Sequence, residues 1–305
     1  MELLLTILAD DILPIFLIAA VGFILARRFR IDVRVLSRVT FNALAPCLVF
    51  NLIVTSHLSA GELGQIVAFT LLLVAVLAVV ARLAALPFGL GRPELAAFLI
   101  VVMFSNAGNY GLSVVLFAFG RDVLARAVVY FVTSALLMYS VGVVVASSGR
   151  SSIGRAAQGL LKVPAMWGLV AAALIVWTGM RLPTGVERPI ELLSVAAIPT
   201  MLLVLGMQLE RSAWPARPGL VAVAAVLILV VSPALGFGLA ALLGLTGAAR
   251  QAVIVQSAMP SAVITTILAL EFDVAPTFVT AVVVVTTAVS PLTVAFLIAL
   301  LQSGY

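Results

Sequence analysis

Apolar runs of about 20 residues recur along the whole chain, and they constrain its fold more than any other feature. A run of that length crosses the roughly 30 Å hydrocarbon core of a bilayer as one α-helix. The composition agrees, because 64% of the 305 residues are hydrophobic and only 10% are charged, whereas soluble domains are about half apolar and a quarter charged. We therefore predict an all-α polytopic membrane protein whose main surroundings are the lipid bilayer.

Glycine, proline and charged residues separate the runs and predict ten transmembrane helices. Their approximate limits are 11–26, 33–55, 63–86, 94–119, 123–146, 163–180, 187–209, 218–244, 249–271 and 275–301. Asp10 and Asp11 precede the first run and Arg27 follows it. A cleaved signal peptide has its positive charge before the apolar core, so we expect this run to be retained with its N-terminus outside.

The basic residues set the predicted orientation in the membrane. With ten helices and the N-terminus outside, twelve basic residues fall on the inner side and five, Arg126 among them, on the outer side. Inner loops carry the excess of positive charge in membrane proteins. We therefore predict a multi-pass protein of the inner (plasma) membrane with both termini outside. The net charge of +5 does not indicate nucleic-acid binding, because these residues are dispersed over short loops.

The positions of the ionisable residues exclude several classes of function. The twelve acidic residues are all predicted at termini, in loops or at helix ends, whereas ion pathways keep carboxylates at membrane depth. The single histidine, His57, lies in a loop, so an intramembrane serine protease is not expected. No phosphate-binding loop or cluster of metal ligands occurs in the sequence. We predict a protein that is not an enzyme and has no metal or cofactor.

The two halves of the chain resemble each other at an offset near 150. Pro46 corresponds to Pro199 at an offset of 153, and the same offset relates Ala107 to Pro260. Each half, 1–150 and 151–305, holds five predicted helices. Because five is odd, the second half enters the membrane upside down, and such inverted repeats are typical of transporters.

Polar breaks interrupt the fourth and ninth runs near their midpoints. The first is MFSNAGNYGLSVV (103–115) and the second is SAMPSA (257–262). Pro260 disfavours a helix by about 3 kcal/mol, and Gly108 and Gly111 each by roughly 1 kcal/mol relative to alanine. Irregular backbone at this depth is tolerated only inside protein or beside a watered cavity. We therefore predict two broken helices that cross.

The breaks also predict a binding site. Asn106, Asn109, Ser257 and Ser261 are expected to cap the half-helix ends and to offer polar groups to a ligand. Amino ends of helices carry partial positive charge. They would stabilise a carboxylate without an arginine nearby. The carboxyl ends at the same crossing would equally suit a cation, and a single kink whose asparagines bond a neighbouring helix is the simpler alternative.

The chain resembles the auxin efflux carrier family, which includes bacterial organic-acid carriers and plant auxin exporters. The resemblance rests on NAGNYGLSVVLFAFG (106–120), AAIPTMLLVLGMQL (196–209) and QSAMPSAVITTILAL (256–270). It implies ten helices in two inverted five-helix repeats, as in bile-acid and sodium/proton exchanger folds, with helices 4 and 9 broken and crossed. It also implies a scaffold of helices 1, 2, 6 and 7, a moving transport domain of helices 3–5 and 8–10, an elevator mechanism and a homodimer.

The resemblance assigns Asn106 and Pro260 to the crossing and Tyr139 to the pocket wall. Together with the residue reading it predicts a secondary transporter that exports a small organic anion, auxin-like or dicarboxylate, by uniport. The expected binding residues are Asn106, Gly108, Asn109, Tyr139, Ser257, Pro260 and Ser261, with Pro46 and Pro199 shaping the scaffold face. A sodium- or proton-coupled carrier of the same fold and a membrane sensor without transport are the alternatives.

Overall fold

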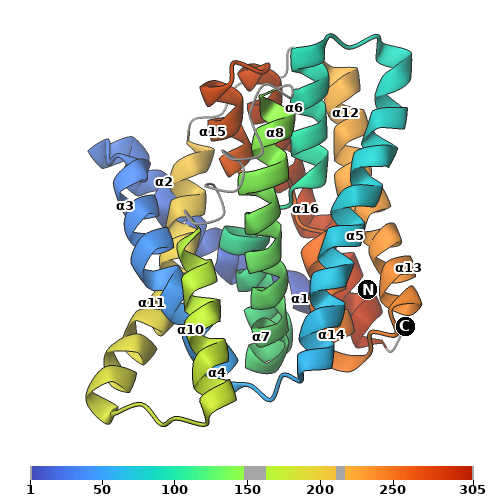
Figure 1. The fold of residues 1–305 in the computed structure, drawn as a ribbon. Helices are drawn as coiled ribbons and strands as arrows, with labels where there is room; N and C mark the ends of the chain where they lie inside the picture. Colours follow the sequence, from blue (N-terminus) through green and yellow to red (C-terminus); the bar gives the residue numbers. More distant parts are fainter. Residues whose placement is uncertain (1, 148–162, 211–216, 304–305) are drawn as a thin grey trace.

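The computed structural model describes residues 2–147, 163–210 and 217–303, and the described residues form helices without any β-strand (Figure 1). Seven helical runs are long and apolar enough to cross a membrane: Leu3–Phe29, Val33–Thr55, Ala60–Phe88, Ala107–Ala146, Thr184–Leu209, Pro218–Leu242 and Pro276–Gln302. These runs confirm the prediction of an all-helical polytopic protein. The ten-helix count and the inverted relation of the halves stay predictions, and the repeat boundary at 150/151 lies outside the described residues.

Short π-helical and 3-10 turns, labelled η, interrupt many of the helices. The first half contains α1 (Glu2–Ile7), η1 (Leu8–Ile12), α2 (Leu13–Phe29), α3 (Val33–Val39), η2 (Thr40–Leu44), α4 (Ala45–Thr55), α5 (Ala60–Ala85), η3 (Leu86–Phe88), α6 (Arg92–Met103), η4 (Ala107–Leu112), α7 (Ser113–Leu137), η5 (Met138–Gly142) and α8 (Val143–Ala146). The second half contains α10 (Pro164–Thr178), α11 (Thr184–Leu209), α12 (Pro218–Val226), η6 (Leu227–Val231), α13 (Ser232–Leu242), α14 (Gly247–Ser257), α15 (Ile264–Glu271) and α16 (Pro276–Gln302).

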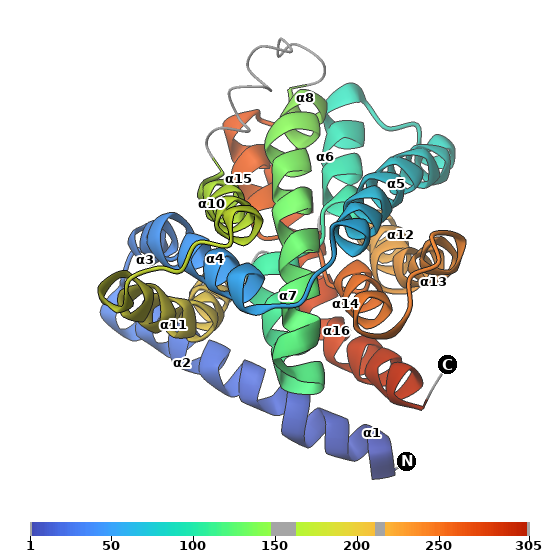
Figure 2. The same cartoon turned by 60° about the horizontal axis from the view of Figure 1, so that its bottom comes forward.

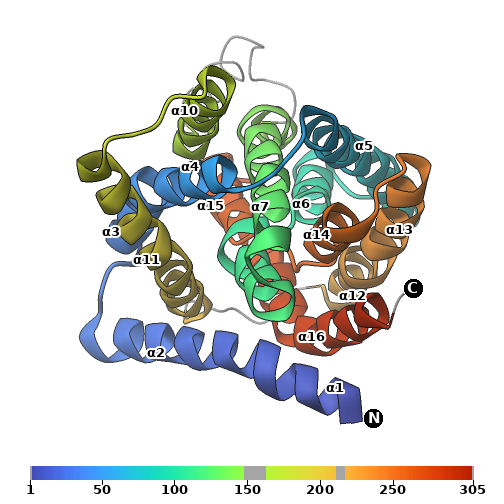
Figure 3. The same ribbon diagram turned by 90° about the horizontal axis from the view of Figure 1, so that it is seen from below.

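Two groups of helices lie on either side of α7 (Figures 2 and 3). One group contains α2, α3, α4, α10 and α11, with α2 packed along α11 and α4 packed along α10. The other group contains α5, α6, α12, α13, α14 and α16. Each group therefore combines helices from both halves of the chain.

Three π-helical turns precede prolines in otherwise continuous helices. The turns η1, η2 and η6 end two residues before Pro14, Pro46 and Pro233, respectively. Proline has no amide hydrogen and its ring clashes with the preceding helical turn. A wider π turn at this point removes the clash, so these prolines bend the local helix geometry without ending the helix.

Small residues allow the helices α2 and α11 to touch at their backbones. A Cβ atom at Gly206 would overlap the carbonyl oxygen of Ala19, and one at Gly22 would overlap that of Leu203. Close backbone approach through small residues is a common source of van der Waals contact between membrane helices. The two glycines therefore fix the spacing of α2 and α11.

The predicted start of the first helix is wrong. The helix begins at Glu2, so Asp10 and Asp11 lie within a continuous helical run instead of before it. The predicted joint FGRD (119–122), between the fourth and fifth helices, is present at Gly120, which leaves helical geometry within α7 at φ 78° and ψ −169°. A positive φ is easily adopted by glycine, so the two helical parts of α7 meet at this kink without a longer loop.

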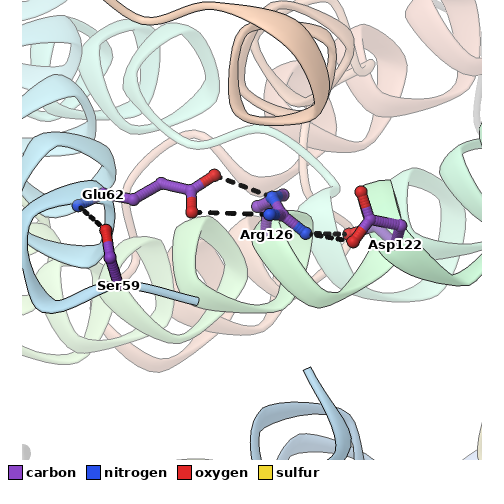
Figure 4. A network of polar contacts seen from close by, with 4 residues as sticks. All are labelled: Ser59, Glu62, Asp122 and Arg126. Carbon is purple, nitrogen blue, oxygen red and sulfur yellow. Dashed lines mark hydrogen bonds and ion pairs between the residues drawn. The ribbon is translucent and has the colours of Figure 1, made fainter. Parts of the chain in front are cut away.

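Arg126 lies in the helix α7 and is buried, so its predicted place in an outer loop is also wrong. Its Nε donates to a carboxylate oxygen of Glu62 at 2.8 Å, and its Nη1 pairs with Asp122 one turn earlier (Figure 4). The amide of Glu62 in turn donates to the Ser59 hydroxyl at 3.1 Å. These contacts neutralise a buried guanidinium and tie the start of α5 to α7.

Replacing Gly206 with alanine is expected to destabilise the protein by about 1–3 kcal/mol, the usual cost of overpacking, because the Ala19 backbone cannot move aside. Gly238→Ala is the matched control, since Gly238 lies in α13 with no atom within 4 Å of the added methyl group. Alanine there should stabilise the helix by about 0.5–1 kcal/mol. Thermal unfolding of purified protein in detergent measures both changes. Equal effects of the two substitutions would contradict the packing argument.

Replacing Arg126 with methionine is expected to destabilise the protein by about 3 kcal/mol, the lower end for a broken buried ion pair, because Glu62 keeps some contact with solvent. The comparison is Arg217→Met, which removes an exposed pair to Glu94 and should change stability by less than about 1 kcal/mol. The same unfolding assay distinguishes them. An Arg126→Met variant as stable as Arg217→Met would show that the network of Figure 4 contributes little.

Candidate functional site

Both predicted breaks are present, and they lie against each other. The helix α6 ends at Met103 and η4 begins at Ala107, while α14 ends at Ser257 and α15 begins at Ile264. The intervening residues, 104–106 and 258–263, leave helical geometry. The break in the first segment is shorter than the sequence suggested.

Two backbone hydrogen bonds join the breaks. The amide of Asn106 donates to the carbonyl of Pro260 at 2.7 Å, and the amide of Ala262 donates to the carbonyl of Phe104 at 2.9 Å. The two segments therefore run antiparallel here and form an isolated bridge. Unpaired backbone groups are costly in a membrane interior, and this bridge pairs four of them.

The predicted capping roles are not observed. Asn106 occupies the position before η4, but its side chain makes no capping bond. Asn109 lies within η4, and the Ser257 hydroxyl donates to the carbonyl of Ile254 in its own helix. Ser261 does not cap α15 either. The bridge already pairs some of the backbone groups that these side chains were expected to cap.

The glycines of the first segment serve packing more than helix breaking. Both lie within the π turn η4. A Cβ atom at Gly108 would come within 2.8 Å of the Phe131 ring, and one at Gly111 would overlap the side-chain oxygen of Gln256. Glycine at these positions lets α7 and α14 approach η4 closely, which the sequence pattern of the run alone did not indicate.

A cavity of about 260 Å³ opens beside the crossing. Its lining residues come from the first helix group with η2, from α7 with η4 and η5, from α15 and from the two breaks: Ser37, Arg38, Phe41, Asn42, Ser105, Asn106, Ala107, Gly108, Asn109, Phe131, Ser134, Ala135, Met138, Tyr139, Val163, Pro164, Ala165, Gln208, Ala262, Val263, Ile264 and Ile267. Three π turns, η2, η4 and η5, contribute to this wall. π-Helical turns are rare and occur frequently at functional sites, so their convergence marks the cavity as the candidate site.

Four of the seven predicted binding residues line this cavity: Asn106, Gly108, Asn109 and Tyr139. The other three lie at the second break and are not among its lining residues: Ser257, Pro260 and Ser261. Pro46 and Pro199 lie on α4 and α11, also outside the lining. The binding roles of all nine stay predictions.

Arg38 is the one charged residue among the described lining residues, and its side chain is exposed. From the sequence alone, Arg38 counts among the twelve basic residues expected on the inner side, and anion binding is expected without a nearby arginine. The structure instead puts a fixed positive charge at the cavity, with no acidic side chain in the described lining. No cluster of three or more potential metal ligands occurs in the part of the chain that the structure describes.

Two amides in the cavity wall have unmet hydrogen-bonding capacity. Asn106 and Asn109 are each 5% exposed, and the Nδ2 of Asn106 and the Oδ1 of Asn109 have no partner among the described residues. The other amide end of Asn109 donates to the Gln208 side chain at a long 3.5 Å. An unpaired buried polar group costs about 1–3 kcal/mol, so a ligand that engages these amides after side-chain rotation would recover free energy.

Sequence reasoning missed Arg38, Gln208 and Gln256. The two glutamines are polar residues inside otherwise apolar runs, VLGMQL and VIVQSAM, and this pattern could have indicated them. Arg38 has the polar neighbours Ser37 and Thr40, so no such pattern marks it. Only the fold reveals that Arg38 and Gln208, 170 positions apart in the sequence, line one cavity.

Comparisons with known proteins indicate a membrane transporter. Residues 150–298 match the family described as membrane transport protein. The chain is also 26% identical over 141 residues to an uncharacterized transporter of Methanocaldococcus jannaschii. That alignment covers 45% of this chain and 46% of the relative, so it spans about half of each.

The members of the matched family are transporters, which agrees with the prediction that the chain is not an enzyme. The match also agrees with the resemblance noted in the sequence, since this family is that of the auxin efflux carriers. The similarity to the membrane transport protein family thus extends over residues 150–298, just under half of the chain.

Proposed function

We propose that the protein is a secondary transporter for a small organic anion that binds in the cavity beside the crossed breaks. The observation that carries the proposal is the meeting of two broken helices next to a cavity lined by Asn106, Asn109 and Arg38. Binding sites formed by discontinuous helices near the bilayer midplane are a general feature of secondary transporters.

The chemistry of the lining supports an amphipathic anion with a carboxylate. Arg38 supplies the positive charge, and the amides of Asn106 and Asn109 supply neutral donors and acceptors. The rest of the wall contains apolar and aromatic side chains, including Phe131 and Ile264. A carboxylate with an apolar body, such as an indole acid, uses more of this wall than a small dicarboxylate does, although both belong to the proposed class.

We also propose an elevator mechanism, which the composition of the cavity lining supports. The lining combines η2, α10 and α11 with a second set of elements, η4, α7 and α15. Movement of the second set past the first would carry the cavity and its contents across the membrane. We further propose ten helices in two inverted repeats, both termini outside the inner (plasma) membrane, a homodimer, and export by uniport.

Two alternatives make different predictions. A sodium- or proton-coupled carrier would show uptake into proteoliposomes that depends on the gradient of that ion. A membrane sensor that kept the fold would bind the ligand without any flux. The absence of a carboxylate from the described cavity lining favours the uncoupled carrier, since ion pathways commonly contain one.

Asn106→Ala is expected to weaken binding of the anion by about 10- to 100-fold, the effect of losing one hydrogen bond to a charged group. The ligand is first identified by a thermal-shift screen of purified protein against organic acids that includes indole acids and dicarboxylates. Asn51→Ala is the control, because Asn51 bonds Ser194 outside the cavity. If Asn106→Ala retains the full ligand-induced shift, Asn106 does not belong to the binding site.

Arg38→Gln is expected to weaken binding of the same anion by about fivefold and to reduce the dependence of its affinity on salt, because an exposed charge acts through a screened field. Arg34→Gln is the matched control: it removes an equal charge one turn away in α3, from a residue outside the lining. Titration at low and high ionic strength measures both variants. If both variants lose the same affinity, the effect comes from the overall positive charge of α3 and not from the position of Arg38 in the cavity lining.

A further inference from the structure

Gln256 is a fully buried polar residue that the proposed transport step does not use. It lies in the last turn of α14 and has no exposed surface. Its Nε2 donates to the carbonyl of Ala107 at 3.2 Å and to that of Ala127 at 3.5 Å. One amide group therefore joins three elements, α14, η4 and α7, at the level of the crossing.

The surroundings of this amide are formed by backbone. Its oxygen has no hydrogen-bond partner among the described residues and lies against Gly111, where any side chain would displace it. The nearest charge along α7 is Arg126, which is already paired with Glu62 and Asp122. Two carbonyl oxygens thus converge on a neutral donor.

Carbonyl oxygens that converge from unwound or broken helices are the ligands that transporters use to hold a monovalent cation. Such a cation and an amide –NH₂ group satisfy the same acceptors. The amide differs in that it is covalently attached, always present and uncharged. A crossing held by an amide therefore needs no ion to keep its geometry.

We propose that the Gln256 amide occupies the position of a bridging monovalent cation and holds η4 against α7 without a bound ion. Gln256 is thus a positioning residue for Asn106 and Asn109, which lie beside or within the segment that it fixes. If the protein transports an anion as proposed above, this role of Gln256 would let the anion move without a coupled cation. That consequence rests on the proposed function, whereas the positioning role of Gln256 does not rest on it.

Gln256→Glu tests the proposal, because it replaces the amide donor with a carboxylate. The carboxylate oxygens then face the carbonyl oxygens of Ala107 and Ala127, and a cation is needed to bridge them. The melting temperature of the purified full-length protein is measured in choline, potassium and sodium chloride at equal ionic strength and alkaline pH. The wild-type protein should melt at the same temperature in all three salts. Gln256→Glu should melt lower in choline, and sodium or potassium should raise its melting temperature by about 5 °C or more, as a specifically bound ligand does.

Gln302→Glu is the matched control, since Gln302 also donates to a backbone carbonyl, that of Ala118, but is exposed. It should show no preference among the salts. Gly111→Ala gives a second test, because the methyl group displaces the Gln256 side chain; it should lower the melting temperature and gain part of the same cation dependence.

Either of two results overturns the proposal. The first is a wild-type protein that sodium or potassium stabilises relative to choline, which would mean that a cation binds despite Gln256. The second is a Gln256→Glu variant that responds equally to all three salts, including one that is unfolded in all of them. Neither result depends on a substrate or on flux, so a failure here is distinct from a failure of the proposed transport function.

Discussion

Two backbone hydrogen bonds between broken helices hold the centre of this molecule, and the candidate site depends on them. Without the bridge, the amides of Asn106 and Ala262 and the carbonyls that they meet would be unpaired at membrane depth, where each group costs several kcal/mol. The breaks therefore stabilise each other, and neither segment could keep its geometry alone. Because η4 begins directly after the bridge, the same two bonds set the positions of the cavity amides.

Two further contacts fix neighbouring helices to each other. On one side, glycines bring α2 and α11 into backbone contact; on another, the buried ion pairs of Arg126 tie α5 to α7. Both contacts join segments that are far apart in the chain, and both leave little freedom for the helices that they connect.

The sequence predicted the helical class, most of the apolar runs and the presence of two breaks, because each follows from local composition and from Pro260. It did not predict how the breaks would be satisfied. Asn106 looked like a cap because capping is a local rule, but the bridge partner Pro260 is 154 positions away. The burial of Arg126 was missed for the same reason: its partner Glu62 lies on another helix, 64 positions earlier. Cavity walls contributed by distant segments, such as Arg38 and Gln208, are beyond any periodicity argument.

The distribution of charge agrees with the proposed binding and release of an anion better than with a receptor of high affinity. The buried guanidinium, Arg126, is neutralised by two carboxylates and is not part of the cavity lining. The positive charge in the lining, Arg38, is exposed, so water and salt screen its attraction for an anion. The buried part of the cavity lining contains the neutral amides of Asn106 and Asn109. A buried and unpaired arginine there would hold an anion too tightly for release, whereas a screened charge and weak hydrogen bonds allow both entry and exit, the balance that conduction and transport require.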